Sequence, residues 1–429
     1  MNRNREARVG VIGAGPSGLT AGKNLLQAGF RNVVIYEKNN QVGGNWVFAP
    51  EASHSSVYET THIISSKTLS HYADYPMPAD YPDYPSHRQL LTYFQGYAEY
   101  FGVTNYIRFN TEVVRAEKQP DEAWKLTLGD GTVEVFDCLL VANGHHWDPR
   151  WPHYPGTFTG QYLHSHAYKR AEPFRNQRVL VIGGGNSACD IAVETSRISA
   201  FTALSLRRGY YIVPKFAMGK PSDVLNEKLI HLPDWLRLPL LRLTLRLNVG
   251  DYADYGLERP THGVLQQHLT MNSELLYFIR HGKVHPRRDV ARFEGQRVHF
   301  ADGRVEEFDT VIAATGFKIS FPFFDQNLID FSEGEVPLYL HIFHPDHPHV
   351  VFYRFGATLG LHLAFSRGAC TIGDTNPPRP LHPARQYARP HPEIPRPHAP
   401  RFPAHRAAYA GGGVSQAFVG GAEGDAGQR

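Results

Sequence analysis

Residues 8–18 read RVGVIGAGPSG, an apolar strand that runs directly into a glycine-rich turn. The turn fits the pattern G-x-G-x-x-G. Its first glycine makes the turn, its second lets backbone approach a pyrophosphate, and its third lets helix and strand pack closely. An apolar-periodic stretch follows as far as Ala28, and a second strand, Val33 to Tyr36, ends at Glu37. This order predicts a βαβ unit that opens a parallel sheet.

The first turn and the residues after it are candidates for binding a dinucleotide. The N-terminus of the predicted helix offers free N–H groups and a positive dipole to phosphates, and Glu37 is placed to accept hydrogen bonds from a ribose. A small-residue loop at 43–46 would let a large cofactor lie against backbone, although an ordinary surface turn is the alternative. The candidate residues are Gly13, Gly15, Pro16, Ser17, Gly18, Glu37, Gly44, Asn45 and Trp46.

The pattern recurs at residues 178–188, which read RVLVIGGGNSA and lead into a helical stretch through Arg197. The next strand, Ala203 to Leu206, ends at Arg207-Arg208 instead of an acidic residue. Guanidinium groups there would pair with a 2′-phosphate, which favours NADPH over NAD, unless these arginines only solvate an edge. The candidate residues of this second site are Gly183, Gly185, Asn186, Ser187, Ala188, Arg207 and Arg208.

Two further strands, Cys138 to Ala142 and Thr310 to Ala314, each end in a small-residue turn, as expected where a chain crosses between domains. We therefore predict an α/β fold of two Rossmann-like domains, one inserted in the other. The first domain is expected at 1–164 and again at 291–353, and the inserted domain at 165–290. About a third of the residues from Thr375 to His405 are proline, so we interpret residues 354–429 as disordered.

The composition of the 429 residues is that of a globular protein, with 42% hydrophobic residues and a formal net charge of +3. No basic block stands out, so neither nucleic acid nor an anionic membrane is expected as a partner. Three cysteines without a Cys-x-x-Cys spacing argue against a metal site, a disulfide framework and a redox dithiol. The polar start, Met1 to Arg8, leaves no room for a signal peptide, so we expect a cytoplasmic location.

No apolar run reaches the roughly 18 to 20 residues that a transmembrane helix needs. The nearest candidate, Leu236 to Leu247, is interrupted by Arg237, Arg242 and Arg246. We interpret it as a helix packed on its own domain. Contact of its leucines with a membrane or a partner is the alternative.

Between the two turns, an aromatic residue, a glycine, a histidine and an aromatic residue recur at Phe158, Gly160, His164 and Tyr168. The residues alone predict a packed hinge, and His145-His146 are expected to be structural. The segment resembles the fingerprint F-x-G-x-x-x-H-x-x-x-[aromatic] of flavin-containing monooxygenases. The resemblance spans residues 8 to 353 and includes Gly43-Gly44-Asn45-Trp46, Arg207-Arg208-Gly209 and Ala314-Thr315-Gly316-Phe317.

The resemblance implies FAD at the first turn and NADPH at the second. NADPH then reduces FAD, the reduced flavin captures O2 as a C4a-hydroperoxide, and a small-molecule amine or sulfide takes the distal oxygen. Tyr168 favours this branch over Baeyer-Villiger monooxygenases, which usually carry tryptophan there, and ketone oxygenation stays the alternative. Nothing in the sequence decides between a monomer and a homodimer.

One departure from the family concerns the flavin-side asparagine that stands three positions before a lysine. Counting back from Lys67 places Ile64 there, and isoleucine offers neither donor nor acceptor. Ser65 or Ser66 could replace it. Otherwise the enzyme leaks hydrogen peroxide and acts as an NADPH oxidase or a defective flavoprotein. We predict appreciable uncoupling of NADPH use from product.

A second departure begins after Tyr353. Relatives continue with a segment like Gly-Leu-x-Gln-Pro-x-Gly-x-Ile-Trp-Pro-x-Ala, whereas residues 354–365 read RFGATLGLHLAF. Codons for these residues, read one nucleotide later, can encode the relatives' segment. We therefore hypothesise a shift of reading frame near Tyr353, which a nucleotide sequence lacking that alternative frame would refute; a genuine disordered extension is the alternative.

Overall fold

The computed structural model describes residues 5–51, 53–266, 269–325, 328, 338, 342–344, 347 and 349–352. Met1–Asp374 forms one compact unit. The interpretation of residues 354–429 and the hypothesis of a frame shift near Tyr353 lie outside the described residues.

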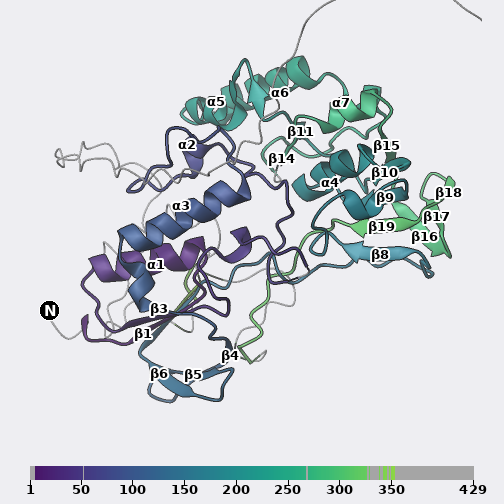
Figure 1. Cartoon of the computed structure of the whole chain (residues 1–429). Coiled ribbons are helices and arrows are strands. Elements are labelled where there is room, and N and C mark those ends of the chain that lie inside the picture. Colours follow the sequence, from purple (N-terminus) through teal and green to yellow (C-terminus); the bar gives the residue numbers. More distant parts are fainter. Residues whose placement is uncertain are drawn as a thin grey trace, which may run out of the picture. The chain divides into compact units, whose positions relative to one another are not determined.

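The first sheet is parallel, with strands in the order β20-β7-β1-β2-β3. Every residue of β1 and β7 is apolar or glycine and buried, as expected for strands covered on both faces. Figure 1 shows α1 and α3 on one side of this sheet and the antiparallel sheet β4-β5-β6 on the other. The bounds are β1 (Val9–Ile12), α1 (Pro16–Gln27), β2 (Val33–Tyr36), α3 (His87–Tyr100), β3 (Ile107–Arg108), β4 (Val113–Lys118), β5 (Trp124–Leu128), β6 (Val133–Phe136), β7 (Cys138–Val141) and β20 (Val350–Phe352).

The second sheet repeats this plan, with parallel strands in the order β15-β10-β9-β19-β8. The helices α4 and α7 pack on one face, and the antiparallel sheet β16-β17-β18 packs on the other. The α/β fold with two Rossmann-like halves is therefore confirmed. The bounds are β8 (Gln161–His164), β9 (Arg178–Ile182), α4 (Asn186–Ser196), β10 (Phe201–Ser205), α7 (Leu275–Arg280), β15 (Val284–Arg287), β16 (Val290–Glu294), β17 (Arg297–Phe300), β18 (Val305–Glu307) and β19 (Thr310–Ala313).

The second sheet extends beyond the limits of 165–290 expected for the inserted domain. Its edge strand β8 begins at Gln161, and β19 enters between β9 and β8, pairing Thr310 with Gln161. The sheet β16-β17-β18 also packs on this half, since Phe293 and Phe300 share a core with Leu180 of β9. The limits drawn at 164/165 and 290/291 therefore need correction, because strands from both flanking stretches complete the second sheet.

Each glycine turn is packed against the end of a crossing strand. Gly13 has φ +103°, and a Cβ built there would lie 2.5 Å from the carbonyl oxygen of Ala142, directly after β7. Gly183 has φ +139°, and a Cβ there would overlap the carbonyl oxygen of Ala314, directly after β19. Because L-residues rarely adopt such φ values and no space exists for a side chain, both positions require glycine. The crossing segments are thus held beside the turns.

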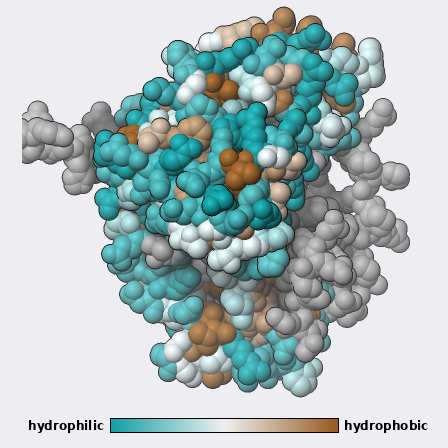
Figure 2. All heavy atoms as spheres, turned by 90° about the vertical axis from the view of Figure 1, so that its right-hand side faces the viewer, coloured by the Kyte–Doolittle hydropathy of each residue, from teal (hydrophilic) through white to brown (hydrophobic). Residues whose placement is uncertain are grey.

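None of the leucines of helix α6 is buried. Its last residue, Val249, is buried, whereas Leu236, Leu243 and Leu247 are exposed by 43%, 53% and 77%. Figure 2 shows hydrophobic side chains at the upper edge of the view, where Figure 1 places α5 to α7. The helix therefore reaches the core of its own half through Val249, and the packing interpreted from the sequence for Leu236 to Leu247 is not borne out.

The remaining elements are short and surround the two sheets. Among the described residues, no helix is both long and apolar enough to cross a bilayer. The bounds are η2 (Gly44–Trp46), α2 (Lys67–Ser70), η3 (Val103–Tyr106), η4 (Glu172–Phe174), β11 (Ile212–Val213), β12 (Phe216–Ala217), β13 (Lys220–Pro221), α5 (Ser222–Leu229), α6 (Asp234–Val249), η5 (Tyr252–Tyr255) and β14 (Thr270–Met271).

Candidate functional site

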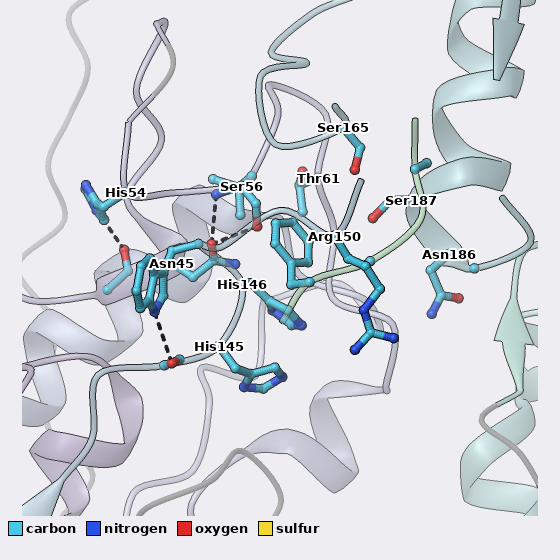
Figure 3. A pocket seen from close by; sticks show the side chains of 18 of the residues that line it. Asn45, His54, Ser56, Thr61, His145, His146, Arg150, Ser165, Asn186 and Ser187 are labelled. Carbon is cyan, nitrogen blue, oxygen red and sulfur yellow. Dashed lines mark hydrogen bonds between the residues drawn. The ribbon is translucent and has the colours of Figure 1, made fainter. Parts of the chain in front are cut away.

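A cavity of about 1330 Å³ lies between the two glycine turns and is lined by residues of both. This volume exceeds the roughly 300–1,000 Å³ typical of a single small-molecule site. Figure 3 shows Asn45 and Ser56 on one wall, Asn186 and Ser187 across from them, and His146 and Arg150 between. The cavity therefore joins the two predicted dinucleotide sites into one space.

The first turn presents its backbone to the cavity. Gly15 is the N-cap of α1 with Pro16 as the first helical residue, and Gly13, Gly15, Pro16 and Ser17 line the wall. Gly18 does not line it. A Cβ there would overlap the carbonyl oxygen of Gly13, so this glycine acts by letting α1 pack on β1. The division of roles predicted for the three glycines is the one that the geometry supports.

Glu37 lies at the end of β2 with its carboxylate buried on the cavity wall. Its Oε2 accepts a hydrogen bond from the amide of Ala14 at 2.8 Å, and its Oε1 accepts from the side-chain amide of Asn39 at 2.6 Å. Oε1 also accepts from the backbone amide of Asn39 at 3.0 Å. Oε2 has a further lone pair, with which Glu37 can accept from a hydroxyl in the cavity.

The loop after Glu37 closes on the first turn. At Gly44, which has φ +53°, a Cβ would lie 3.0 Å from the Cα of Gly15. The Oδ1 of Asn45 accepts hydrogen bonds from the amide of Ser56 at 2.8 Å and from its hydroxyl at 2.9 Å. Gly44, Asn45 and Trp46 all line the cavity. The loop is thus part of the cavity wall and not an ordinary surface turn.

The second turn has the same construction. Gly185 is the N-cap of α4, and Gly183, Gly185, Asn186 and Ser187 line the cavity. The Oδ1 of Asn186 accepts from the amide of Met271 at 2.7 Å, which fixes its side chain. Ala188 is fully buried and does not line the cavity, so its part is the close packing of α4 on the sheet.

Arg207 and Arg208 lie at the cavity beyond the end of β10, and both are exposed. Neither forms a salt bridge with any carboxylate in the part of the chain that the structure describes. The Cζ of Arg208 lies 5.5 Å from the centre of the Tyr210 ring. Two guanidinium groups without an acidic partner suit a polyanion, because ion pairs to phosphate are strong and bidentate.

Comparison with known proteins assigns most of the chain to one protein family. A family model described as flavin-binding monooxygenase-like matches residues 6–360. The chain belongs to this family. It is 36% identical over 359 residues to Flavin-containing monooxygenase 5 of Rattus norvegicus, covering 79% of this chain and 67% of that protein.

A further relative supports the family assignment, and a solved structure shares the fold. Dimethylaniline monooxygenase [N-oxide-forming] 2 of Oryctolagus cuniculus is 33% identical over 360 residues, covering 79% of this chain and 66% of that protein. The solved structure of a flavin-containing monooxygenase from Stenotrophomonas maltophilia has a TM-score of 0.64 at 24% identity, covering 83% of this chain and 92% of that one. This flavin-binding monooxygenase-like protein is accordingly an oxidoreductase of the flavoprotein monooxygenase class.

Residues at the end of the family fingerprint pack behind the cavity wall and contact the loop at Ser55. Tyr168 is buried, its hydroxyl donates to Oε2 of Glu194 at 2.7 Å, and its ring stacks on Phe174. Nζ of the buried Lys169 donates to the carbonyl oxygen of Ser55 at 2.7 Å, and burial lowers the pKa of Lys169 to about 8. The packed hinge predicted from the residues is therefore present, and it anchors the loop that carries Ser56.

His164 of the fingerprint lies between the rings of Trp151 and Phe317, with centroid distances of 5.5 Å and 5.3 Å. Burial lowers the pKa of His164 to about 4, so the ring is neutral at pH 7. Trp151 and Phe317 line the cavity, one from each crossing segment. His164 thus packs between the two segments that cross between the halves, through Trp151 on one and Phe317 on the other.

Ile64 stands at the position of the family's flavin-side asparagine and lines the cavity, but only one of the two candidate serines does. Ile64 and Ser65 line the cavity. Ser66 does not: its amide donates to Oδ2 of Asp223 at 2.6 Å and the residue is fully buried. Ser66 is therefore no longer a candidate.

His145 and His146 line the cavity, which the sequence interpretation missed by treating them as structural. Their rings lie 4.1 Å apart, and burial lowers the pKa of His146 to about 4. Arg150, which was also not singled out, lines the cavity close by. The signal that could have found them is their place directly after the crossing strand β7, since ligands bind at the carboxyl ends of parallel strands.

Proposed function

We propose that this protein is an FAD- and NADPH-dependent monooxygenase that oxygenates soft nitrogen or sulfur nucleophiles. The observation that carries the proposal is the single cavity lined by both glycine turns, with Glu37 at one and two unpaired arginines at the other. Two dinucleotides bound at these turns would extend into one space. That arrangement suits direct transfer between cofactors, because reacting groups must be held in contact.

The first turn fits FAD. The backbones of Gly15 and Gly44 approach each other closely there, since a Cβ at Gly44 would lie 3.0 Å from the Cα of Gly15, so two glycine backbones form this part of the wall. The start of α1 would hold the pyrophosphate and Glu37 the ribose, and Asn45 would keep the loop beside the ring system. A bound flavin would supply hydride acceptance and oxygen activation. The residues named here bind and orient, and none is required as a nucleophile.

The second turn fits NADPH. Gly185 has no atom within 4 Å of a built Cβ, so space remains at the N-terminus of α4 for a pyrophosphate. Arg207 and Arg208 would pair with the 2′-phosphate. His146 and His164 are held neutral by burial, so neither adds positive charge beside a nicotinamide.

The proposed substrate class rests on the similarity of this chain to a named relative and to the family fingerprint. One relative is named for dimethylaniline N-oxide formation, and the fingerprint ends in Tyr168 instead of tryptophan. We therefore propose a small amine or sulfide with O2 as the reactants. Parallel assays with a ketone distinguish Baeyer-Villiger oxygenation, the alternative at this position.

The visible spectrum of the purified full chain, supplied with FAD and then with NADPH under nitrogen, tests the proposal. A flavin spectrum that NADPH bleaches and O2 restores, with N- or S-oxide formed from an added amine or sulfide, is the expected result. A chain that stays colourless with saturating FAD is a defective flavoprotein and contradicts the proposal. Bleaching by NADPH without any oxygenated product identifies an NADPH oxidase instead.

Ile64 is expected to cause leakage of hydrogen peroxide. It places an apolar side chain on the cavity wall, where no hydrogen bond to oxygen can form. The wild-type chain should release peroxide as a substantial fraction of NADPH consumed. Ile64→Asn should lower that fraction several-fold, because one hydrogen bond of about 1 kcal/mol changes a partition ratio about fivefold. Peroxide and NADPH are measured together.

Leu69→Asn, an exposed leucine of α2 outside the cavity lining, is the control and should leave the ratio unchanged. Tight coupling in the wild-type chain would contradict the prediction.

A further inference from the structure

Two carboxylates lie one turn apart on α4, directly after the second glycine turn. Asp190 and Glu194 occupy positions i and i+4, so their side chains emerge on the same face of the helix. Asp190 is half-buried and lines the cavity, whereas Glu194 is half-buried and does not line it. The accessible surface of Glu194 therefore faces outside the cavity, and the pair connects the cavity with the surroundings.

Each carboxylate accepts a hydrogen bond from a tyrosine that another segment contributes. The hydroxyl of Tyr58 donates to Oδ2 of Asp190 at 2.9 Å, and that of Tyr168 donates to Oε2 of Glu194 at 2.7 Å. The two tyrosine rings meet edge to face with centroids 5.6 Å apart. Because a hydroxyl both donates and accepts, this arrangement can pass protons as well as hold them.

The charges around the pair do not neutralise it. Asp190 faces Lys215 and Glu274, and its Oδ1 accepts from Nδ2 of Asn272 at 2.6 Å. Glu194 faces Arg197 and the exposed Glu59. Arg197 is itself paired with Glu274. The other titratable group beside Asp190 is the buried thiol of Cys189, whose pKa burial raises.

Burial raises the pKa of both carboxyl groups, that of Glu194 to about 7, while the hydrogen bond from Tyr168 opposes the shift. Two neighbouring carboxylates in a poorly solvated place do not both ionise readily, so the pair keeps a proton to higher pH than exposed carboxylates do. The pair therefore binds a proton at pH values at which exposed glutamates are ionised.

We propose that Asp190 and Glu194 form a proton relay, in which Asp190 delivers a proton to the cavity and Glu194 replaces it from solvent. The inference rests on the proposed function, whose balance is substrate + O2 + NADPH + H⁺ → oxygenated substrate + NADP⁺ + H2O. One proton must therefore enter the cavity in every turnover. The O–H bond of Asp190 breaks, and its proton ends in the water that the reaction forms. Solvent then protonates Glu194, and Glu194 passes that proton to Asp190.

The first test needs no cofactor. Between the ordinary glutamate value of 4.5 and about 7, the folded chain holds a proton that the unfolded chain releases. The free energy of unfolding of the wild-type chain should therefore fall as pH rises through this window. Glu194→Gln is isosteric and cannot titrate, so its stability relative to wild type should rise over the same window. Glu99→Gln, an exposed position on α3, should follow the wild type.

The second test follows turnover of the FAD-loaded full chain with NADPH and an amine from pH 6 to 9. Wild-type kcat should fall above about pH 7. Asp190→Asn should lower kcat roughly 100-fold at pH 7 and remove the pH dependence, as expected when a proton donor is lost. The KM for NADPH should not change, because the second turn and its arginines stay intact. A role in folding alone would not give this division between kcat and KM.

The outcomes separate the relay from the proposed function. A pH-independent difference in stability between Glu194→Gln and wild type, or superimposable pH profiles of kcat for Asp190→Asn and wild type, overturns the relay. A pH-dependent stability difference in a chain that binds FAD but never oxidises NADPH supports the shared proton and contradicts the proposed function.

Discussion

Gly18→Ala is expected to prevent this chain from folding into a flavin-binding protein. A Cβ at Gly18 would overlap the carbonyl oxygen of Gly13, where α1 starts across the end of β1. The carbonyl oxygen belongs to backbone and the Cβ position is fixed by the backbone of residue 18, so neither atom can move without shifting the helix from the sheet. Overpacking typically costs about 1–3 kcal/mol, and a backbone clash lies at or above the top of that range. Since whole domains are stable by only about 5–15 kcal/mol, we expect insoluble protein or a lower urea midpoint without flavin absorbance.

Gly185→Ala is the matched control for this substitution. It stands in the second turn at the N-cap of α4, where a built Cβ has no atom within 4 Å. Its urea midpoint should therefore stay close to the wild-type value, within about 0.5 kcal/mol of stability. Binding of NADP⁺ should nevertheless weaken, because the added methyl occupies the space proposed for the pyrophosphate. Equal destabilisation by both substitutions would contradict this account of the two glycines.

Replacing Arg207 and Arg208 together by alanine is expected to remove the preference for NADPH. A hydrogen bond to a charged group contributes about 1.5–3 kcal/mol, so loss of contact with a 2′-phosphate should lower kcat/KM for NADPH by roughly 100-fold or more. NADH carries no such phosphate, and its kcat/KM should change little. Steady-state rates with both nucleotides measure the ratio directly.

Arg242→Ala provides the control for lost positive charge, because this exposed arginine of α6 does not line the cavity. It should leave both rates unchanged. If the double substitution lowers the rates with NADPH and NADH equally, the arginines support the fold or the pyrophosphate and do not select the 2′-phosphate.

Local patterns predicted the parts of the fold that depend on neighbours in sequence. The strands at Val33–Tyr36 and Arg178–Ile182 have the predicted bounds, because an apolar run and a glycine turn fix each end. The limits of the inserted half could not be found in this way. Strand β8 is a four-residue segment, and only its pairing with β19, far along the chain, assigns it to the second sheet.

In the site, too, residues that follow a local pattern were predicted, whereas contacts between distant segments were not. Glycine turns, Glu37 and the paired arginines follow from spacing, and the cavity contains them. Spacing did not show that Ser66, the N-cap of α2, is fully buried and does not line the cavity. Asp190 and Glu194 could be placed on one helix face from sequence. Their tyrosine partners come from other segments, so the network required the structure.

The strands of the second sheet lie in sequence between β7 and β20 of the first sheet, and this determines which sheet is completed first during synthesis. The second sheet has all five strands once Ala313 has been made, whereas the first sheet still lacks β20 at Val350–Phe352. Until then β7, apolar along its whole length, has an open edge on the side that β20 will occupy. Open apolar edges invite pairing with other chains. The half that leaves the ribosome first is therefore finished last, and the edge of β7 stays open while the insert is translated.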